Sequence, residues 1–224
     1  MIIESQMVVR VNHSLKIPDI ETAKISDLEM ETKKNSSLLR LCSPEKSAQQ
    51  KKIDAFLKKI NYKDKPITEI AQKCSEYIFK NFTYTKGITN VETTIDEILV
   101  HKKGVCQDFA HVLLQFLRTA GIPSRYVSGY ICPNTAGYRG EGATHAWVEF
   151  YTPTQGWLGI DPTNNIWTME NHVKLSVGRD FNDCTPVKGT FKGIAKQTLS
   201  VSVSIGYEDG RQFEEINDVK LEEI

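Results

Sequence analysis

The chain has 224 residues, of which 40% are hydrophobic, and its 28 basic side chains balance 28 acidic ones. Because the formal net charge is +0, no overall field would attract nucleic acid or an anionic membrane surface. The longest apolar run, Val112 to Leu114, is far shorter than the roughly 18 residues that a membrane-spanning helix needs. We therefore expect a globular protein with neither nucleic acid nor a membrane as its partner.

Five cysteines, an odd number, stand without the spacing of a disulfide framework or of a metal site, at positions 42, 74, 106, 132 and 184. The residues after Met1 have no basic start, long apolar core or small-residue cleavage site, so no signal peptide is expected. A reduced, cytoplasmic location is the simpler interpretation, and loss of an export signal is the alternative. We expect no metal and no cofactor.

The chain begins with weak alternation around Met7, Val9 and Val11, which favours two or three strands. These strands are too few to enclose a core of their own. The polar stretch from Ser43 to Ser47 then marks a junction. We therefore predict a partial or reduced N-terminal β region over residues 1–47 and one larger domain over residues 48–224.

Helices dominate the next part of the chain. Apolar residues recur at helical spacing from Ile53 to Ile60 and from Ile67 to Ile78, and a shorter helix is expected over residues 95–100. The stretch 106–120 leaves only a narrow polar stripe, so it predicts a central, nearly buried helix that Gly121 terminates.

Strands follow the helices, with candidates over residues 125–131, 143–151, 157–161, 172–177 and 199–207. Helices first and strands afterwards indicate an α+β fold with an antiparallel sheet, since a parallel sheet would alternate the two.

Cys106 stands where a glycine-containing turn leads into the most hydrophobic predicted helix. The free N–H groups and the dipole at a helix N-terminus favour an anion, so they favour the reactive thiolate. The alternative is a buried structural cysteine, which is the commonest fate of a free cysteine and suits Cys74 better.

His145 and Asp161 belong to neighbouring predicted strands joined by a turn near Pro153. A hairpin would make them cross-strand neighbours, or nearly so, on one face. The carboxylate could then bind the imidazole N–H, fix its tautomer and stabilise the imidazolium. Cys106, His145 and Asp161 thus constitute a candidate nucleophile, base and orienting group.

Other polar residues have structural interpretations. Asp108, His111 and Gln115 share the polar stripe of the central helix, and we interpret them as its hydrogen-bonded side in preference to a second network around the site. Glu149 is equally well explained as the ion-pair partner of Arg125 or Arg139.

Four segments together resemble the bacterial transglutaminase-like superfamily, and the likeness extends over about residues 50–207. The segments are 104–111 (GVCQDFAH), 118–130 (RTAGIPSRYVSGY), 145–149 (HAWVE) and 156–164 (GWLGIDPTN). The resemblance implies a papain-like cysteine protease and transglutaminase core, with Cys106, His145 and Asp161 as the catalytic triad. Family members commonly have a β-rich domain before the core, so residues 1–47 would be a truncated or reduced form of it.

The implied reaction is acyl transfer at a peptide or protein amide through a thioester on Cys106. The backbone N–H of Cys106 is the natural first oxyanion donor, and Tyr84 or Gln107 is the candidate for the second. Trp147 and Trp157 are candidate walls of a substrate cleft, and the glycine-rich loop over 133–142 is a candidate flap. The calcium dependence of animal transglutaminases is not transferred, because no acidic cluster resembles a calcium loop.

The sequence does not determine whether water or an amine is the acyl acceptor. Hydrolysis by a cysteine peptidase or amidase is preferred, because water is always available and no amine-acceptor site is evident. Alternatives are a protein-glutamine transglutaminase with an amine acceptor, a non-catalytic binding or scaffold module, and thiol redox chemistry that pairs Cys106 with Cys132. The sequence does not predict an oligomeric state.

Overall fold

The structure is a computed structural model that describes residues 6–10, 22–90, 93–132, 138–140, 144–185, 189, 198–206 and 212–220. Its helices are α1 (Ile25–Lys34), α2 (Ser36–Leu41), α3 (Gln50–Lys59), η1 (Tyr62–Asp64), α4 (Ile67–Asn81), α5 (Ile95–His101), α6 (Cys106–Thr119) and η2 (Phe181–Cys184). Its strands are β1 (Thr83–Tyr84), β2 (Lys103–Gly104), β3 (Ser124–Ile131), β4 (Thr144–Thr152), β5 (Gly156–Asp161), β6 (Ile166–Trp167), β7 (His172–Gly178), β8 (Thr198–Gly206) and β9 (Gln212–Lys220).

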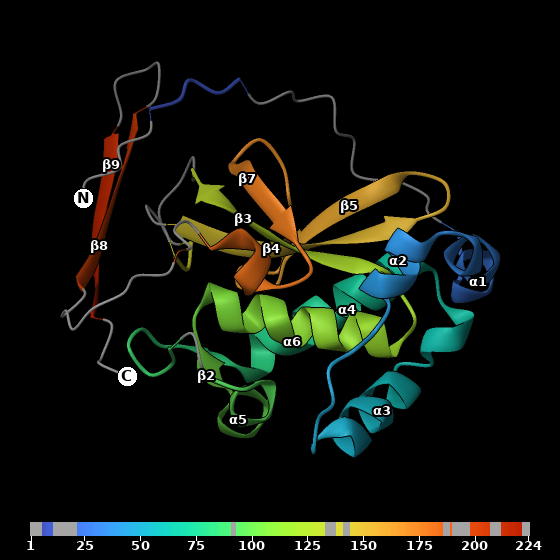
Figure 1. Ribbon diagram of the computed structural model, residues 1–224. Coiled ribbons are helices and arrows are strands. Elements are labelled where there is room, and N and C mark those ends of the chain that lie inside the picture. The colour runs from blue at the N-terminus through green and yellow to red at the C-terminus, as the bar shows by residue number, and fades with distance from the viewer. Residues whose placement is uncertain are drawn as a thin grey trace.

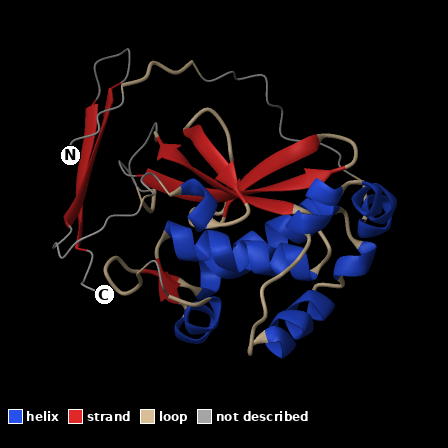
Figure 2. Ribbon diagram, viewed as in Figure 1, coloured by secondary structure: helices blue, strands red, loops and turns tan. Residues whose placement is uncertain are grey.

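Five strands form an antiparallel sheet in the order β6-β5-β4-β3-β7, and the larger helices gather on one side of it (Figures 1 and 2). The strand β7 therefore does not extend the row of hairpins but returns to pair with β3. This two-layer arrangement confirms the predicted α+β fold, and the helices over 53–60, 67–78, 95–100 and 106–120 are also confirmed.

The helix α6 lies between the sheet and the other helices. Its apolar positions, among them Phe109, Leu113 and Leu117, are 0% exposed and belong to the same core as Ile70 of α4 and Val148 of β4. The wide apolar surface that the sequence shows over 106–120 is therefore covered from more than one side. None of the described helices is both long and apolar enough to cross a bilayer.

The predicted N-terminal β region is wrong for residues 25–41, which form α1 and α2 (Figure 1). Leu28 and Thr32 are buried one turn apart on α1, and Asn35 caps α2 by accepting hydrogen bonds from backbone N–H groups. Residues 6–10 have no regular structure, and the rest of the alternating stretch lies outside the described residues. Short alternation cannot make a strand without a partner strand.

The N-terminal helices also share the core of the larger domain. The α1 residue Leu28 is 1% exposed and belongs to the main hydrophobic cluster, while the N–H of Ile67 donates to the carbonyl of Ala23 at 2.9 Å. The predicted strand over 199–207 is confirmed as β8, which pairs with β9 in a separate two-stranded sheet.

Candidate active site

The start of α6 is fixed by a short parallel ladder and a carboxylate cap. Tyr84 of β1 pairs with Gly104 of β2, directly before the helix. The Asp108 carboxylate accepts hydrogen bonds from the Val105 N–H and the Thr89 hydroxyl, both at 2.7 Å. A Cβ on Gly104 would collide with this carboxylate, so only glycine fits there. The cap thus sets where α6 begins, and it begins at Cys106.

Cys106 is half-buried and lies beside the imidazole of His145. The other side of that ring contacts Asp161, because His145 Nε2 is 2.8 Å from Asp161 Oδ2. His145 Nδ1 has no hydrogen bond of good geometry among the described residues. The imidazole therefore has one nitrogen fixed by a carboxylate and the other available on the side of Cys106 and Gly140.

The hairpin of β4 and β5 brings His145 and Asp161 together. Val148 pairs with Ile160, so the next step of the ladder sets Asp161 against the segment of Trp147 and His145. The prediction that His145 and Asp161 are near neighbours across the hairpin is confirmed. Both side chains are 0% exposed.

In this pair the attraction between the two charges has a larger effect on both pKa values than burial has. Burial alone would lower the pKa of His145, but the Asp161 carboxylate, with help from Cys106, raises that pKa to about 10. Burial alone would likewise raise the pKa of Asp161, whereas His145 and then His172 hold it well below its usual range. Around neutral pH the pair is an imidazolium against a carboxylate.

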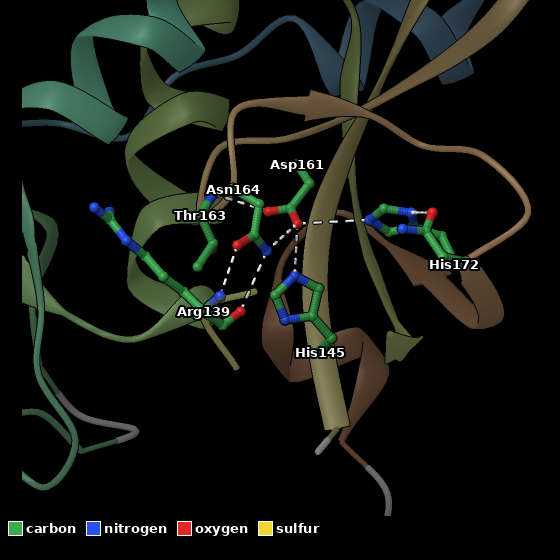
Figure 3. Close-up of polar contacts among 7 residues, drawn as sticks. Arg139, His145, Asp161, Thr163, Asn164 and His172 are labelled. Atoms are coloured by element: carbon green, nitrogen blue, oxygen red, sulfur yellow. Dashed lines mark hydrogen bonds and ion pairs between the residues drawn. The ribbon is translucent and has the colours of Figure 1, made fainter. Parts of the chain in front are cut away.

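Two further groups hold the Asp161 carboxylate, as Figure 3 shows. The Thr163 N–H donates to Oδ1 at 2.8 Å, and the Asn164 side-chain amide donates to Oδ2 at 2.8 Å. Asn164 also binds the backbone of Arg139, accepting its N–H at 2.7 Å and donating to its carbonyl at 3.2 Å. One asparagine thus connects the orienting carboxylate to the loop that passes His145.

Sequence reasoning missed His172, which points to the same Asp161 oxygen as His145 does (Figure 3). Its Nε2 is 3.5 Å from Asp161 Oδ2, and its side chain is 1% exposed. The only signal was a histidine at the first position of an alternating segment. That segment reaches the site because β7 pairs with β3, where His172 lies opposite Ile131.

Three side chains here have the chemistry of metal ligands. Ligand atoms of His145, Asp161 and His172 all lie within 4.8 Å of one another, and two histidines with a carboxylate can hold a divalent transition metal. The same Asp161 oxygen already contacts His145 and accepts a hydrogen bond from Asn164. A cation would therefore have to displace the proton between His145 and Asp161.

Tyr84 lies near the site, and its role as an oxyanion donor stays a prediction. A Cβ on Gly140 would be 3.4 Å from the Tyr84 hydroxyl and 3.1 Å from His145 Nδ1, so the two groups border the same small space. The ring of Tyr84 also packs edge-on against Phe109 at 6.3 Å. Gln107 follows Cys106 on the helix and is half-buried, and its role stays a prediction.

The two tryptophans do not form an open cleft in this structure. Trp147 is 1% exposed and packs edge-on against His172, with ring centroids 5.1 Å apart. Trp157 pairs with Tyr151, at the opposite end of β4 from His145, and the Arg125 guanidinium lies 4.0 Å from its ring. Trp147 therefore supports the site from inside, and Trp157 is distant from it.

The remaining polar residues have structural roles. Asp108 caps α6, His111 accepts the N–H of Phe181 at 3.3 Å, and Gln115 exchanges two hydrogen bonds with the backbone of Glu45. This confirms their interpretation as the hydrogen-bonded side of α6. Glu149 binds Arg125 at 2.7 Å and also Lys174 at 2.7 Å, so its interpretation as an ion-pair residue is confirmed as well.

A hollow of about 370 Å³ lies elsewhere, against α3 and η1, where Leu57, Tyr62 and Thr119 are among its lining residues. It contains none of the candidate catalytic residues. Of the predicted flap over 133–142, the structure describes residues 138–140, and the rest lies outside the described residues. Gly140 approaches His145 at a positive φ of 77°, which favours glycine.

Comparison with known proteins finds similarity over the segment that contains Cys106, His145 and Asp161. The family model of the transglutaminase-like superfamily matches residues 54–162. An uncharacterised protein of Mycobacterium leprae is 42% identical over 125 residues, which cover 54% of this chain and 44% of that protein. A protein-glutamine gamma-glutamyltransferase of Pseudomonas aeruginosa is 33% identical over 108 residues, covering 45% of this chain and 16% of that enzyme. The chain spans less than half the length of these curated relatives.

A solved structure shares the fold. It is that of a protein from Cytophaga hutchinsonii proposed to be a cysteine protease, with a TM-score of 0.57 and 23% sequence identity. The superposition covers 91% of this chain and 61% of that one. The likeness supports the papain-like architecture of helices on an antiparallel sheet.

Proposed function

We propose that the chain is a transglutaminase-like protein that performs thiol-dependent acyl transfer at amide bonds, since the model of that superfamily matches residues 54–162. One observation carries the proposal. Cys106, at the first position of a buried helix, lies beside a histidine whose opposite nitrogen is 2.8 Å from a buried carboxylate. This is the arrangement of a nucleophile, a base and an orienting group.

The first half of the reaction forms a thioester. The Cys106 proton is held by His145, and the sulfur attacks the amide carbonyl carbon to give a tetrahedral oxyanion. When this intermediate collapses, the imidazolium gives its proton to the leaving nitrogen, and ammonia or an amine departs. Asp161 keeps the ring oriented and stabilises its positive charge during both transfers.

The oxyanion needs donors at the helix start. The backbone N–H of Cys106 has no partner within the first turn of α6, so it can donate to the substrate oxygen. We assign the second donation to the Tyr84 hydroxyl, because it borders the same space as His145 Nδ1. Replacing one such donor typically slows the chemical step by about 10² to 10³.

The second half of the reaction releases the acyl group. His145 takes a proton from the acceptor, which then attacks the thioester carbonyl and frees the sulfur. We propose water as the acceptor and a peptide or protein amide as the substrate, which makes the chain a cysteine peptidase or amidase. An amine acceptor is the second candidate, favoured by the 33% identity to the gamma-glutamyltransferase of P. aeruginosa.

The activated thiol can be tested without knowing the substrate. We expect iodoacetamide to alkylate Cys106 at pH values well below the midpoint of about 8.5 that a free thiol shows. Cys42 is a matched control because it is also half-buried, while burial raises its pKa to about 11. Equal alkylation of both cysteines across pH, or a midpoint for Cys106 near about 8.5, would sink the proposal.

The acyl acceptor is then resolved by product analysis. The protein is incubated with a peptide library, with and without a primary amine, and mass spectrometry scores ammonia release, chain cleavage and amine incorporation together. Hydrolysis without incorporation supports the peptidase or amidase, whereas incorporation supports the transglutaminase. Products that persist unchanged with Cys106→Ala would contradict both.

A further inference from the structure

The Asp161 carboxylate lies between two histidines, and only one of them contacts Cys106. His145 Nε2 is 2.8 Å and His172 Nε2 is 3.5 Å from the same oxygen, Oδ2. The match to the family model ends at residue 162, so it does not extend to His172. A buried histidine directed at a buried carboxylate calls for an explanation beyond packing.

The surroundings of His172 fix the direction of its ring. Its side chain is 1% exposed, and its Nδ1 lies 3.0 Å from the side-chain oxygen of Asn171. Trp147 packs edge-on against it, with the rings at 78°. Gly129 provides the room for this contact, because a Cβ there would come within 2.6 Å of the indole. With one nitrogen at Asn171, the other points to Asp161 (Figure 3).

The Asp161 carboxylate needs more than one donor to keep its orientation. It is fully buried, and each donor on its oxygens further restricts its rotation about the χ2 angle. The Thr163 N–H holds Oδ1, while the donors near Oδ2 are Asn164 and the two histidines. His172 contacts Asp161 from β7, whereas His145 contacts it from β4, so side chains of two different strands hold the carboxylate.

We propose that His172 is a positioning residue: its Nε2–H, which is 3.5 Å from Asp161 Oδ2 and without good hydrogen-bond geometry in this structure, attracts that oxygen and keeps it directed at His145. His172 acts through Asp161 and does not touch the substrate. Loss of this contact leaves Oδ2 with only His145 and Asn164, so the carboxylate can shift relative to His145 and stabilise its imidazolium less well. The inference rests on the proposed function of the Cys106 and His145 pair.

The test compares three variants by the pH dependence of Cys106 alkylation. His172→Phe keeps an aromatic ring against Trp147 but has no donor, and His172→Gln keeps a side-chain N–H. His111→Gln is the control, since His111 is a half-buried histidine that binds the Phe181 N–H instead of Asp161. Thermal melting of each protein is recorded alongside.

With His172→Phe we expect the low-pH limb of Cys106 alkylation to move up by about one pH unit or more, toward that of a free thiol. His172→Gln should recover most of this shift, and His111→Gln should match the wild type. An unchanged profile in His172→Phe would overturn the inference, as would an equal shift in His172→Gln, since neither result needs a donor at this position.

A measurement on the wild-type protein does not depend on how the variants fold. Nitrogen NMR of the labelled histidine rings at pH 7 should show a proton on His172 Nε2, and a bare nitrogen there would overturn the inference. The wild-type alkylation profile separates the two proposals. If the midpoint of Cys106 alkylation in the wild type is that of a free thiol, the proposed function is contradicted. If the midpoint is low and the His172 variants leave it unchanged, only the role of His172 is contradicted.

Discussion

Two histidines of this protein, His145 fully buried and His111 half-buried, titrate in opposite directions. The pKa of His145 is raised to about 10, whereas burial lowers the pKa of His111 to about 4. His145 faces the Asp161 carboxylate, and His111 accepts a backbone N–H from Phe181. Burial disfavours the charged form of both rings, so the neighbouring group decides which ring is charged at neutral pH.

Removing the carboxylate should make the two histidines alike. In Asp161→Asn the carboxylate that raises the pKa of His145 is gone while burial still lowers it, so this pKa should fall from about 10. We expect turnover of an amide substrate to drop by about 10⁴, because the imidazole loses both its tautomer and its stabilised charge. NMR titration of the ring measures the pKa. A His145 pKa that stays near 10 would contradict the electrostatic account of the site.

The two rings should also oppose each other in stability against pH. The folded pKa of His111, about 4, lies below its ordinary 6.5, so its stabilising contribution is present above pH 6.5 and is lost as pH falls through 4. The contribution of His145 is present below pH 6.5 and is lost as pH rises through about 10.

The acid side of this difference is measurable with His111→Gln. Between pH 7 and pH 4 the wild type should lose about 3 kcal/mol more unfolding free energy than the variant does. The reason is that the unfolded wild type binds a proton at His111 over this range, whereas the folded state keeps that ring neutral until about pH 4. Urea unfolding of both proteins at the two pH values gives the difference. Parallel losses in the two proteins would show that His111 does not resist protonation.

A substitution at Gly140 can disturb the Nδ1 side of His145 while the Asp161 carboxylate stays in place on the Nε2 side. A Cβ on Gly140 would lie 3.1 Å from His145 Nδ1, and the φ of 77° is strained for alanine. We expect Gly140→Ala to lower turnover about tenfold or more by displacing the ring from Cys106. Gly156→Ala is the matched control, because its φ of 73° is similar and nothing lies within 4 Å of the added carbon. Equal losses in both variants would indicate backbone strain alone.

The smallest effect is expected for an ion pair in which one partner is exposed. Glu149 binds Arg125 and Lys174, and the Lys174 side chain is 47% exposed. We expect Lys174→Ala to cost about 0 to 1 kcal/mol of unfolding free energy, since solvent screens the pair and Arg125 remains. Denaturant unfolding measures it. A cost above about 2 kcal/mol would show that Glu149 depends on Lys174 much as Asp161 depends on His145.

Local pattern was sufficient where a segment carries its own periodicity. The apolar repeat over 106–120 predicted α6, and the spacing of His145 and Asp161 about a turn predicted their approach across a hairpin. The pattern failed around Met7 and Val9, because a few alternating residues do not determine whether a partner strand exists. Residues 25–41 are helical instead, with Leu28 packed into the core.

The contact between His172 and Asp161 could not be predicted from the sequence pattern. His172 was visible as the start of a strand, and β7 is confirmed, but its partner strand could not be predicted. Only the pairing of β7 with β3 brings the ring to within 3.5 Å of Asp161. Asn164 is similar, since its amide joins Asp161 to the backbone of Arg139 across 25 positions of sequence.

The sequence by itself determined the helix that begins at Cys106, the hairpin that joins His145 to Asp161, and the α+β order of the fold. These features depend on residues close together in the chain, whose spacing fixes the face on which each side chain lies. The tertiary structure alone decided which way each histidine titrates, that Trp147 is enclosed, and that His172 meets Asp161. Those features depend on desolvation and on strand order, which arise only when distant segments pack together.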